Sequence, residues 1–288
     1  MNEVALTQRA QPWLGTLVSM RVEGDRALAE EAMARAFAEV AEIHQAMSAH
    51  DPASELSRLN RLEPGQSLAL APPLRRVLGA ALALAQASGG LFDPTVGGLL
   101  AARGRLPEPG GRPADPAADW RDLTLERGSR ARLRRRLVLD LGGIAKGYAV
   151  DRALARLRRP GIRAAIVNAG GDLRSFGTIH QVWVRDPDQP ERCLPAVEIE
   201  NAAVATSGGY FSESETATDL LDPRSGASLA TTAGKGDLSV TVCARRAIWA
   251  DALTKVVLAD ADAALPLLRR LGASALLLGK NGARRQLA

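Results

Sequence analysis

The sequence predicts an α+β protein, and two observations support that fold class. Hydrophobic residues make up 46% and charged residues 24% of the 288 residues, which is ordinary globular usage and excludes wholesale disorder. Segments typical of strands and of helices follow one another in irregular clusters with several expected hairpins, which favours α+β over a doubly wound sheet. The length favours one domain over residues 1–288, built as a single body or as two closely packed lobes.

The chain begins with an expected strand over residues 13–22, where polar and apolar residues alternate. A long helix is expected over 25–47, because one set of side chains recurs there at spacings of 4, 3, 4 and 3. This helix face comprises Met33, Phe37, Val40, His44 and Met47. We interpret His44 as a packed side chain, because an isolated histidine on an apolar face has no chemical partner. The next expected segments are a polar segment over 48–60 with a turn at Asp51-Pro52, a helix over 73–87 and a glycine-rich loop over 89–98.

Two segments in the middle of the chain have unusual compositions. Residues 103–119 hold four prolines and three glycines, so we expect an exposed loop there. Residues 127–136 are rich in arginine, and we favour a solvated hairpin edge over a binding site. The remaining expected segments are strands over 137–141, 164–168, 181–185, 195–200, 202–206, 238–243 and 274–278, helices ending near Arg158 and covering 246–258 and 262–271, and a polar loop over 207–237.

Composition excludes several classes of protein. The net charge is only +5 and aromatic residues make up 3%, so neither charge nor base stacking indicates a nucleic-acid partner. Cys193 and Cys243 are too few for a disulfide framework or a CxxC metal site. No apolar run reaches the roughly 18 residues of a membrane span. Residues 1–10 lack the apolar core of a signal peptide, so we expect a cytoplasmic protein if the sequence is complete, and a periplasmic one if a leader was removed.

The segment around Lys146, one of only four lysines, has the features of an anion site. The strand expected over 137–141 is followed by Gly142-Gly143 and then by a helix, whose N-terminus would present free N–H groups to an anion. Lysine is favoured at helix C-termini, so a lysine in the first turn indicates an anionic ligand such as a phosphate. The alternative is a surface lysine in an ordinary strand–turn–helix connection, and this segment alone leaves both interpretations open.

A second charged pair lies in the apolar helix expected over 246–258. Asp251 and Lys255 are four residues apart, so an ordinary helix salt bridge is one interpretation. The flanking residues are apolar, which indicates that the pair is buried, and a buried charge pair needs a reason. Asp93-Pro94, Gly170-Gly171 and the DPRSG segment at 222–226 are expected to form turns.

Eight stretches of the chain carry more information in their order than any one of them does alone. They are LGTLVSM (14–20), MSAHDPASELSRLN (47–60), GGLFDPTVGGLL (89–100), LDLGGIAKGYAVDRAL (139–154), VNAGGDLRSFG (167–177), ATSGGYF (205–211), LLDPRSG (220–226) and SVTVCARRAIWADAL (239–253). Taken in this order, they resemble the ApbE-type FAD:protein FMN transferases. The resemblance covers most of the chain and implies a T-fold-like α+β architecture, with antiparallel sheets and helices around a central FAD cleft. It also implies Mg²⁺-dependent transfer of FMN from FAD to a Ser or Thr hydroxyl of an acceptor protein, with AMP as the leaving group, or hydrolysis of FAD to FMN and AMP.

The resemblance assigns roles to individual positions. The implied catalytic residues are Asp251, Lys146 and Asp219. The implied metal ligands are a backbone carbonyl near Gly143, the carboxylate of Asp251 and a threonine hydroxyl. The implied FAD contacts are Leu14, His50, Leu91, Phe92, Asp93, Asp140, Lys146 and Leu220.

The chain departs from the family pattern at the metal site and at the expected acid/base. Lys255 stands where the family has a threonine metal ligand, and Thr254 lies one residue earlier, about 100° round the helix. Asp219 stands where the family usually has a histidine, and Gly209 where it often has an aspartate.

Three functions remain open at this point. In a working transferase, Lys255 turns away or Thr254 replaces the missing ligand. In a FAD-binding or flavin-delivery protein, the ammonium replaces the metal charge and turnover is weak or absent. The third is an α+β protein with no flavin function. We favour the working transferase, because Lys146 and Asp251 are both present.

Overall fold

The computed structural model describes residues 5–189, 191–208, 220–229, 238–280 and 282–288. Within these residues, thirteen strands form three antiparallel sheets. The large sheet has the strand order β1-β2-β6-β7-β10-β11-β12-β13. Its strands are β1 (Ala5–Trp13), β2 (Thr16–Gly24), β6 (Ile162–Ala169), β7 (Asp172–Phe176), β10 (Ala203–Gly208), β11 (Ser239–Ala244), β12 (Ser274–Leu278) and β13 (Arg284–Leu287). This antiparallel sheet with interspersed helices confirms the α+β prediction.

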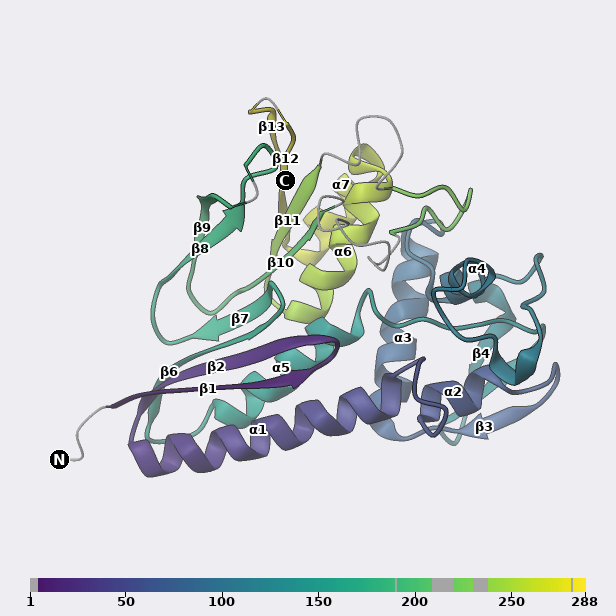
Figure 1. Ribbon diagram of the computed structural model, residues 1–288, viewed down its shortest axis with the longest axis horizontal. Coiled ribbons are helices and arrows are strands. Elements are labelled where there is room, and N and C mark those ends of the chain that lie inside the picture. The colour runs from purple at the N-terminus through teal and green to yellow at the C-terminus, as the bar shows by residue number, and fades with distance from the viewer. Residues whose placement is uncertain (1–4, 190, 209–219, 230–237, 281) are drawn as a thin grey trace.

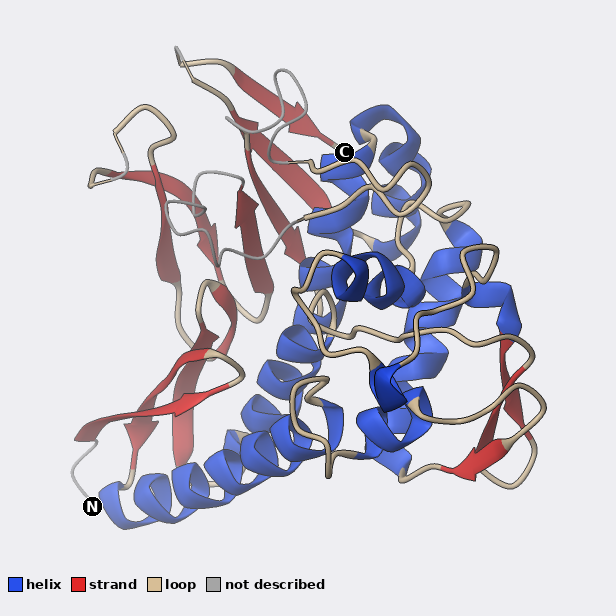
Figure 2. Cartoon of the chain, turned by 45° about the vertical axis from the view of Figure 1, so that its right-hand side comes forward, coloured by secondary structure: helices blue, strands red, loops and turns tan. Residues whose placement is uncertain are grey.

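Helices cover one face of the large sheet (Figures 1 and 2). The covering helices are α1 (Arg26–Met47), α5 (Ala145–Leu157) and α6 (Ala247–Ala259), with α7 (Ala261–Leu271) beside α6. Beyond them lie α2 (Glu55–Asn60), α3 (Pro72–Ala87), α4 (Gly97–Ala102) and a small sheet of order β3-β5-β4, made of β3 (Ser67–Ala69), β4 (Leu123–Glu126) and β5 (Arg130–Leu133). A separate hairpin joins β8 (His180–Arg185) to β9 (Cys193–Ile199). Short 3-10 turns cover Pro94–Val96, Pro109–Gly111 and Trp120–Asp122.

The core lies between the large sheet and its helices. In β2 the alternate residues Val18, Met20 and Val22 are buried, which is the pattern of a strand with one face on a core. Four members of the predicted α1 face are buried as well. The half-buried His44 packs against Trp13, with 5.8 Å between the ring centroids and the ring planes tilted by 56°. Among the described helices, none combines the length and the hydropathy needed to cross a membrane.

The single strand predicted over 13–22 is wrong, because the chain turns inside it. Leu14 and Gly15 both have positive φ, 58° and 71°, and they join β1 to β2 as a tight hairpin. A leucine rarely adopts the left-handed conformation. The Leu14-Gly15 pair is also not one of the Asn-Gly or Gly-Gly pairs that indicate a two-residue hairpin turn. The first strand of the hairpin, residues 5–13, was therefore not expected.

The strand predicted over 137–141 is also wrong, although this segment is extended and largely buried. The side-chain amide of Asn60 takes the place of a neighbouring strand. Its Nδ2 donates to the Leu139 carbonyl at 3.0 Å, and its Oδ1 accepts from the Leu139 N–H at 2.9 Å. The Asp140 N–H donates to the Pro94 carbonyl at 2.8 Å. The buried backbone is thus satisfied without a strand ladder.

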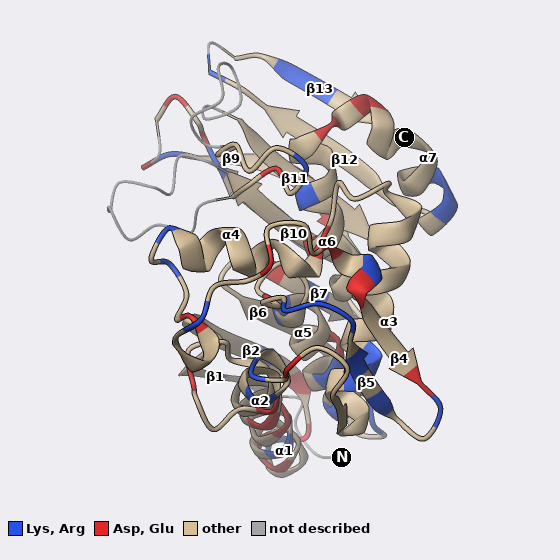
Figure 3. Cartoon of the chain, turned by 90° about the vertical axis from the view of Figure 1, so that its right-hand side faces the viewer, with Lys and Arg blue, Asp and Glu red and all other residues tan. Residues whose placement is uncertain are grey.

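The arginine-rich segment 127–136 supplies the turn and the second strand of the β4–β5 hairpin, but that strand, β5, is the middle strand of the small sheet rather than an edge. Acidic residues lie among its arginines (Figure 3). Arg132 pairs with Glu126 at 2.5 Å, and Arg136 pairs with Glu63 at 2.5 Å. This local pairing offsets part of the positive charge. Most of the loop 103–119 is exposed, apart from a few side chains such as Leu106.

Candidate functional site

Lys146 lies in the first turn of α5 and reaches a carboxylate on β7. Its Nζ is 2.9 Å from Asp172 Oδ2 in an ion pair and donates to the Gly142 carbonyl at 3.3 Å. The side chain of Asp172 is buried, whereas that of Lys146 is 27% exposed. Burial alone would lower the pKa of Lys146, but the charges of Asp172 and Asp251 outweigh it and raise that pKa above its ordinary value. Lys146 is therefore a permanent cation that remains open to a ligand.

Asp251 lies on α6, and its carboxylate is fully buried. Its Oδ2 accepts from the Gly147 N–H at 3.0 Å. Its Oδ1 is 2.5 Å from Lys255 Nζ and 3.7 Å from Lys146 Nζ. Burial would raise the pKa of Asp251, but the two ammonium groups lower it below its usual value. We call Lys146, Lys255, Asp172 and Asp251 the charged cluster.

The charged cluster depends on close contact between α5 and α6. A Cβ atom on Gly147 would lie 2.2 Å from the Ala247 carbonyl oxygen and 2.9 Å from Asp251 Cβ. Only glycine allows the two helices to come this close, and the approach brings the Gly147 N–H to the carboxylate. The sequence predicted the two helices separately, and only their close packing brings Lys146 and Asp251 into one site.

The pKa values of two further carboxylates, Asp172 and Asp140, are shifted in the opposite direction from that of Asp251. Burial raises the pKa of Asp172, and the neighbouring charge of Asp251 raises it further. Burial also raises the pKa of Asp140, whose Oδ1 accepts from the Gly142 N–H at 3.2 Å. The Gly142 hydrogen bond and the charge of Lys146 act on the pKa of Asp140 in the opposite direction. The predicted FAD contact Asp140 thus lies beside the turn that begins α5, whereas His50 is an exposed residue shortly after the end of α1.

Phe92 and Lys255 meet over Gly143. A Cβ atom on Gly143 would lie 3.4 Å from Lys255 Cε and 3.5 Å from Phe92 Cε2. Leu91 and Phe92 are both buried, and Asp93 accepts from the Thr95 N–H at 2.8 Å as the cap of a 3-10 turn. Burial raises the pKa of Asp93. The segment Leu91–Asp93 is therefore joined to the charged cluster through the contact of Phe92 at Gly143.

The other predicted site residues lie elsewhere or outside the description. Leu14 is in the β1–β2 turn, half-buried against the core. The carbonyl of Leu220 accepts from the Leu229 N–H at 2.6 Å, in a segment that Arg103 joins to α4 by a hydrogen bond to the Gly226 carbonyl. The predicted acid/base Asp219 lies outside the described residues.

The described residues do not fit the Mg²⁺ site that the resemblance implies. Both oxygens of the Asp251 carboxylate already accept from internal donors. Thr254 does not supply the missing ligand, because its Oγ1 donates to the Asp251 carbonyl at 2.7 Å and lies 2.8 Å from Ser207 Oγ. Mg²⁺ requires a nearly octahedral oxygen shell at about 2.0–2.1 Å. Among the residues described, no cluster of three His, Cys, Asp or Glu side chains could hold a metal.

Sequence reasoning missed the roles of two aspartates. Asp172 follows Gly170-Gly171, and that pair alone indicated only a turn. Asp151 on α5 caps a different helix, because it accepts from the Ala247 N–H at 2.9 Å and the Ile248 N–H at 3.2 Å. Both contacts join residues remote in sequence, so no local spacing could have indicated them.

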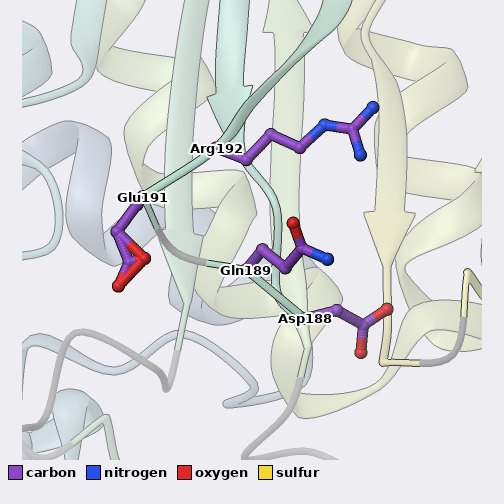
Figure 4. A pocket seen from close by; sticks show the side chains of 4 residues that line it. All are labelled: Asp188, Gln189, Glu191 and Arg192. Atoms are coloured by element: carbon purple, nitrogen blue, oxygen red, sulfur yellow. The ribbon is translucent and has the colours of Figure 1, made fainter.

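A surface depression in the 188–192 loop lies apart from the charged cluster. It is lined by Asp188, Gln189, Glu191 and Arg192. Figure 4 shows that Glu191 points away from Arg192, so the charged groups do not converge on one point. We assign no chemistry to it.

Comparison with known proteins identifies the family. The ApbE family model matches residues 14–277. The FAD:protein FMN transferase of Rhodobacter capsulatus is 33% identical over 260 residues, covering 83% of this chain and 48% of that protein. The enzyme of the same name from Treponema pallidum is 28% identical over 279 residues, covering 85% of this chain and 76% of its own length. The chain thus spans about half of the first relative and three quarters of the second.

The fold matches a solved structure along almost its whole length. The crystal structure of the ApbE protein from Thermotoga maritima superposes with a TM-score of 0.83 at 25% identity, covering 98% of this chain and 97% of that one. This agrees with the architecture that the sequence motifs implied. The family match, which extends over nearly all of the sequence, shows that the chain belongs to the ApbE family.

Proposed function

We propose that this protein is a FAD:protein FMN transferase, which moves FMN from FAD to a Ser or Thr hydroxyl of an acceptor protein and releases AMP. The family match and the names of the curated relatives support this activity. The observation that carries it on the structural side is the position of Lys146, whose partly exposed ammonium lies at the glycine turn that begins α5.

The reaction needs positive charge beside the diphosphate of FAD. The acceptor oxygen forms a bond to the phosphorus of the FMN half, and the bond from that phosphorus to the oxygen of the AMP half breaks. The hydroxyl proton passes to a base, and AMP leaves with the bridging oxygen. Lys146 would neutralise charge on the diphosphate as the bond breaks, and the Gly143 N–H of the glycine turn would bind one of its oxygens.

The carboxylates of the charged cluster would position the ammonium groups rather than react. Asp172 on β7 and Asp251 on α6 hold the ammonium of Lys146 beside the glycine turn that begins α5. Asp251 also holds Lys255. We propose Asp219 as the proton acceptor, on the resemblance alone. Phe92 and Asp140 would line the flavin-binding side, because both lie against the glycine turn, and Leu91 directly precedes Phe92 in the chain.

A second candidate is a flavin-binding protein that turns FAD over weakly or not at all. The contact of Lys255 with Asp251 favours it, since an ammonium supplies charge but cannot organise an oxygen shell as a metal does. The two candidates share the FAD site and differ only in AMP release.

The test is to measure FAD binding by titration and AMP release by chromatography with water or a serine-containing peptide as acceptor. We expect FAD to bind and AMP to appear above the protein-free rate. Binding without AMP would select the second candidate, and absence of FAD binding would contradict both. Ser225→Ala, at an exposed position of the 222–226 turn, serves as a control variant that leaves the charged cluster intact.

A further inference from the structure

The charged cluster has equal numbers of positive and negative groups. Two ammonium groups, Lys146 and Lys255, face two buried carboxylates, Asp172 and Asp251. Both ammonium groups lie within 4 Å of the same atom, Asp251 Oδ1. A divalent cation bound to this carboxylate would meet two like charges at short range in a site partly screened from water.

Lys255 is held in place by three kinds of contact. Its Nζ donates to Asp251 Oδ1 at 2.5 Å and to the Asp251 carbonyl at 3.2 Å. Its stem packs over Gly143 beside the ring of Phe92. Asp251 and Gly143 are the two positions that the resemblance assigns to the metal, and Lys255 contacts both. It therefore occupies the space between them.

The hydrogen bonds of Lys255 to Asp251 leave one N–H of its ammonium for a further acceptor. An ammonium has three N–H donors, and among the described residues two are used by Asp251. The side chain is 17% exposed, whereas Asp251 is fully buried. A ligand oxygen can thus reach Lys255 without displacing its partner, whereas a metal ion must displace the ammonium to reach Asp251.

We propose that Lys255 is a built-in cation that replaces the divalent metal, so that this protein binds the diphosphate of FAD without Mg²⁺. The identity of the ligand rests on the proposed function. The exclusion of the metal rests only on the position of Lys255.

The first experiment measures metal binding without FAD, by electron paramagnetic resonance with Mn²⁺ as the probe. The variants are Lys255→Thr, which restores a hydroxyl one helical turn from Asp251, and Lys255→Met, which keeps the length but removes the charge. We expect Lys255→Thr to bind Mn²⁺ at least about tenfold more tightly than wild type. Lys255→Met should gain less, because a thioether is a poor ligand for a hard cation.

This result depends on folded variants, which circular dichroism and thermal unfolding would verify. Asp251 retains the Gly147 N–H and Lys146 in each variant, so a folded protein is expected. The exclusion proposal is overturned if wild type and Lys255→Thr bind Mn²⁺ equally, whether both tightly or both not at all.

The second experiment needs no variant. The affinity of the wild-type protein for FAD is measured in excess EDTA and again in excess MgCl₂. We expect the two dissociation constants to agree within about twofold, and an increase in affinity of about tenfold or more with Mg²⁺ would overturn the proposal. If FAD does not bind in either buffer, the proposed function fails, and the Mn²⁺ experiment still decides the role of Lys255.

Discussion

Lys146 is held by carboxylates from two different elements, Asp172 on β7 and Asp251 on α6. Such a residue has two roles that must be separated experimentally. In the proposed function it offers an ammonium to the FAD diphosphate, and in the fold it neutralises Asp172, which is buried. Removing it affects both ligand binding and the stability of the folded protein, because a buried carboxylate is then left without its partner.

At the residue scale, Lys146→Ala should weaken FAD binding by about 1–3 kcal/mol, the usual value of a hydrogen bond to a charged group. The measurement is a titration at moderate salt on protein shown to be folded. The matched control is the double variant Lys146→Ala with Asp172→Asn, which removes the unpaired charge and should recover stability but not affinity. An unchanged affinity in the single variant would remove Lys146 from the site.

At the scale of elements, the contact between α5 and α6 creates the site. Gly147 brings its N–H to Asp251, and Asp151 caps the start of α6 from the middle of α5. These contacts tie the first turn of one helix to the body of the other. The separation of the two helices therefore sets the distance between Lys146 and Asp251.

Gly147→Ala should lower the free energy of unfolding by about 1–3 kcal/mol or more, because the added methyl group meets backbone that cannot rotate away. The control is Gly79→Ala in α3, where the nearest atom to an added Cβ is Leu125 Cδ1 at 3.7 Å. That change should stabilise the helix by about 0.5–1 kcal/mol. Urea unfolding measures both. A Gly147→Ala protein as stable as the Gly79→Ala protein would show that α5 and α6 can separate at little cost in free energy.

At the scale of the whole molecule, α1 and α5 are joined across the helix layer by one acidic residue. Glu39 accepts from Arg152 Nε at 2.7 Å and from Arg156 Nε at 2.6 Å. Burial would raise the pKa of Glu39, but the two arginines outweigh it and lower the pKa below the ordinary 4.5. A lowered folded-state pKa means that this group stabilises the fold above pH 4.5, and that the contribution is lost as the pH falls through the folded-state value.

Glu39→Gln should therefore destabilise the protein most above pH 4.5, and the difference from wild type should shrink on acidification. Thermal unfolding over a pH series measures this. Glu30→Gln is the control, because Glu30 pairs with Arg26 at 3.4 Å on the exposed face of α1, and a surface pair contributes little at any pH. A Glu39→Gln difference that stays constant with pH would contradict the assigned role.

Several elements followed from sequence alone, because their signals are local. The helix over 25–47 follows from the periodic spacing of its apolar residues, and the helix over 246–258 and the strand over 274–278 follow from runs rich in apolar residues. The order of the eight motif stretches, which include those around Lys146 and Asp251, also indicated the family, and the comparisons confirmed it. Where a local signal was absent, as at the Leu14-Gly15 turn, the prediction failed.

Tertiary structure decided the features that join distant parts of the chain. The sequence determined that Asp251 and Lys255 share one face of a helix, since four residues make about one turn. It left open whether Lys255 turns away from Asp251 or stays with it, and the packing of Gly143 and Phe92 against its stem holds it beside Asp251. The same holds for the Asn60 side chain that replaces a strand partner 79 residues away. Such contacts depend on how separate elements approach each other, and no spacing along the sequence encodes that approach.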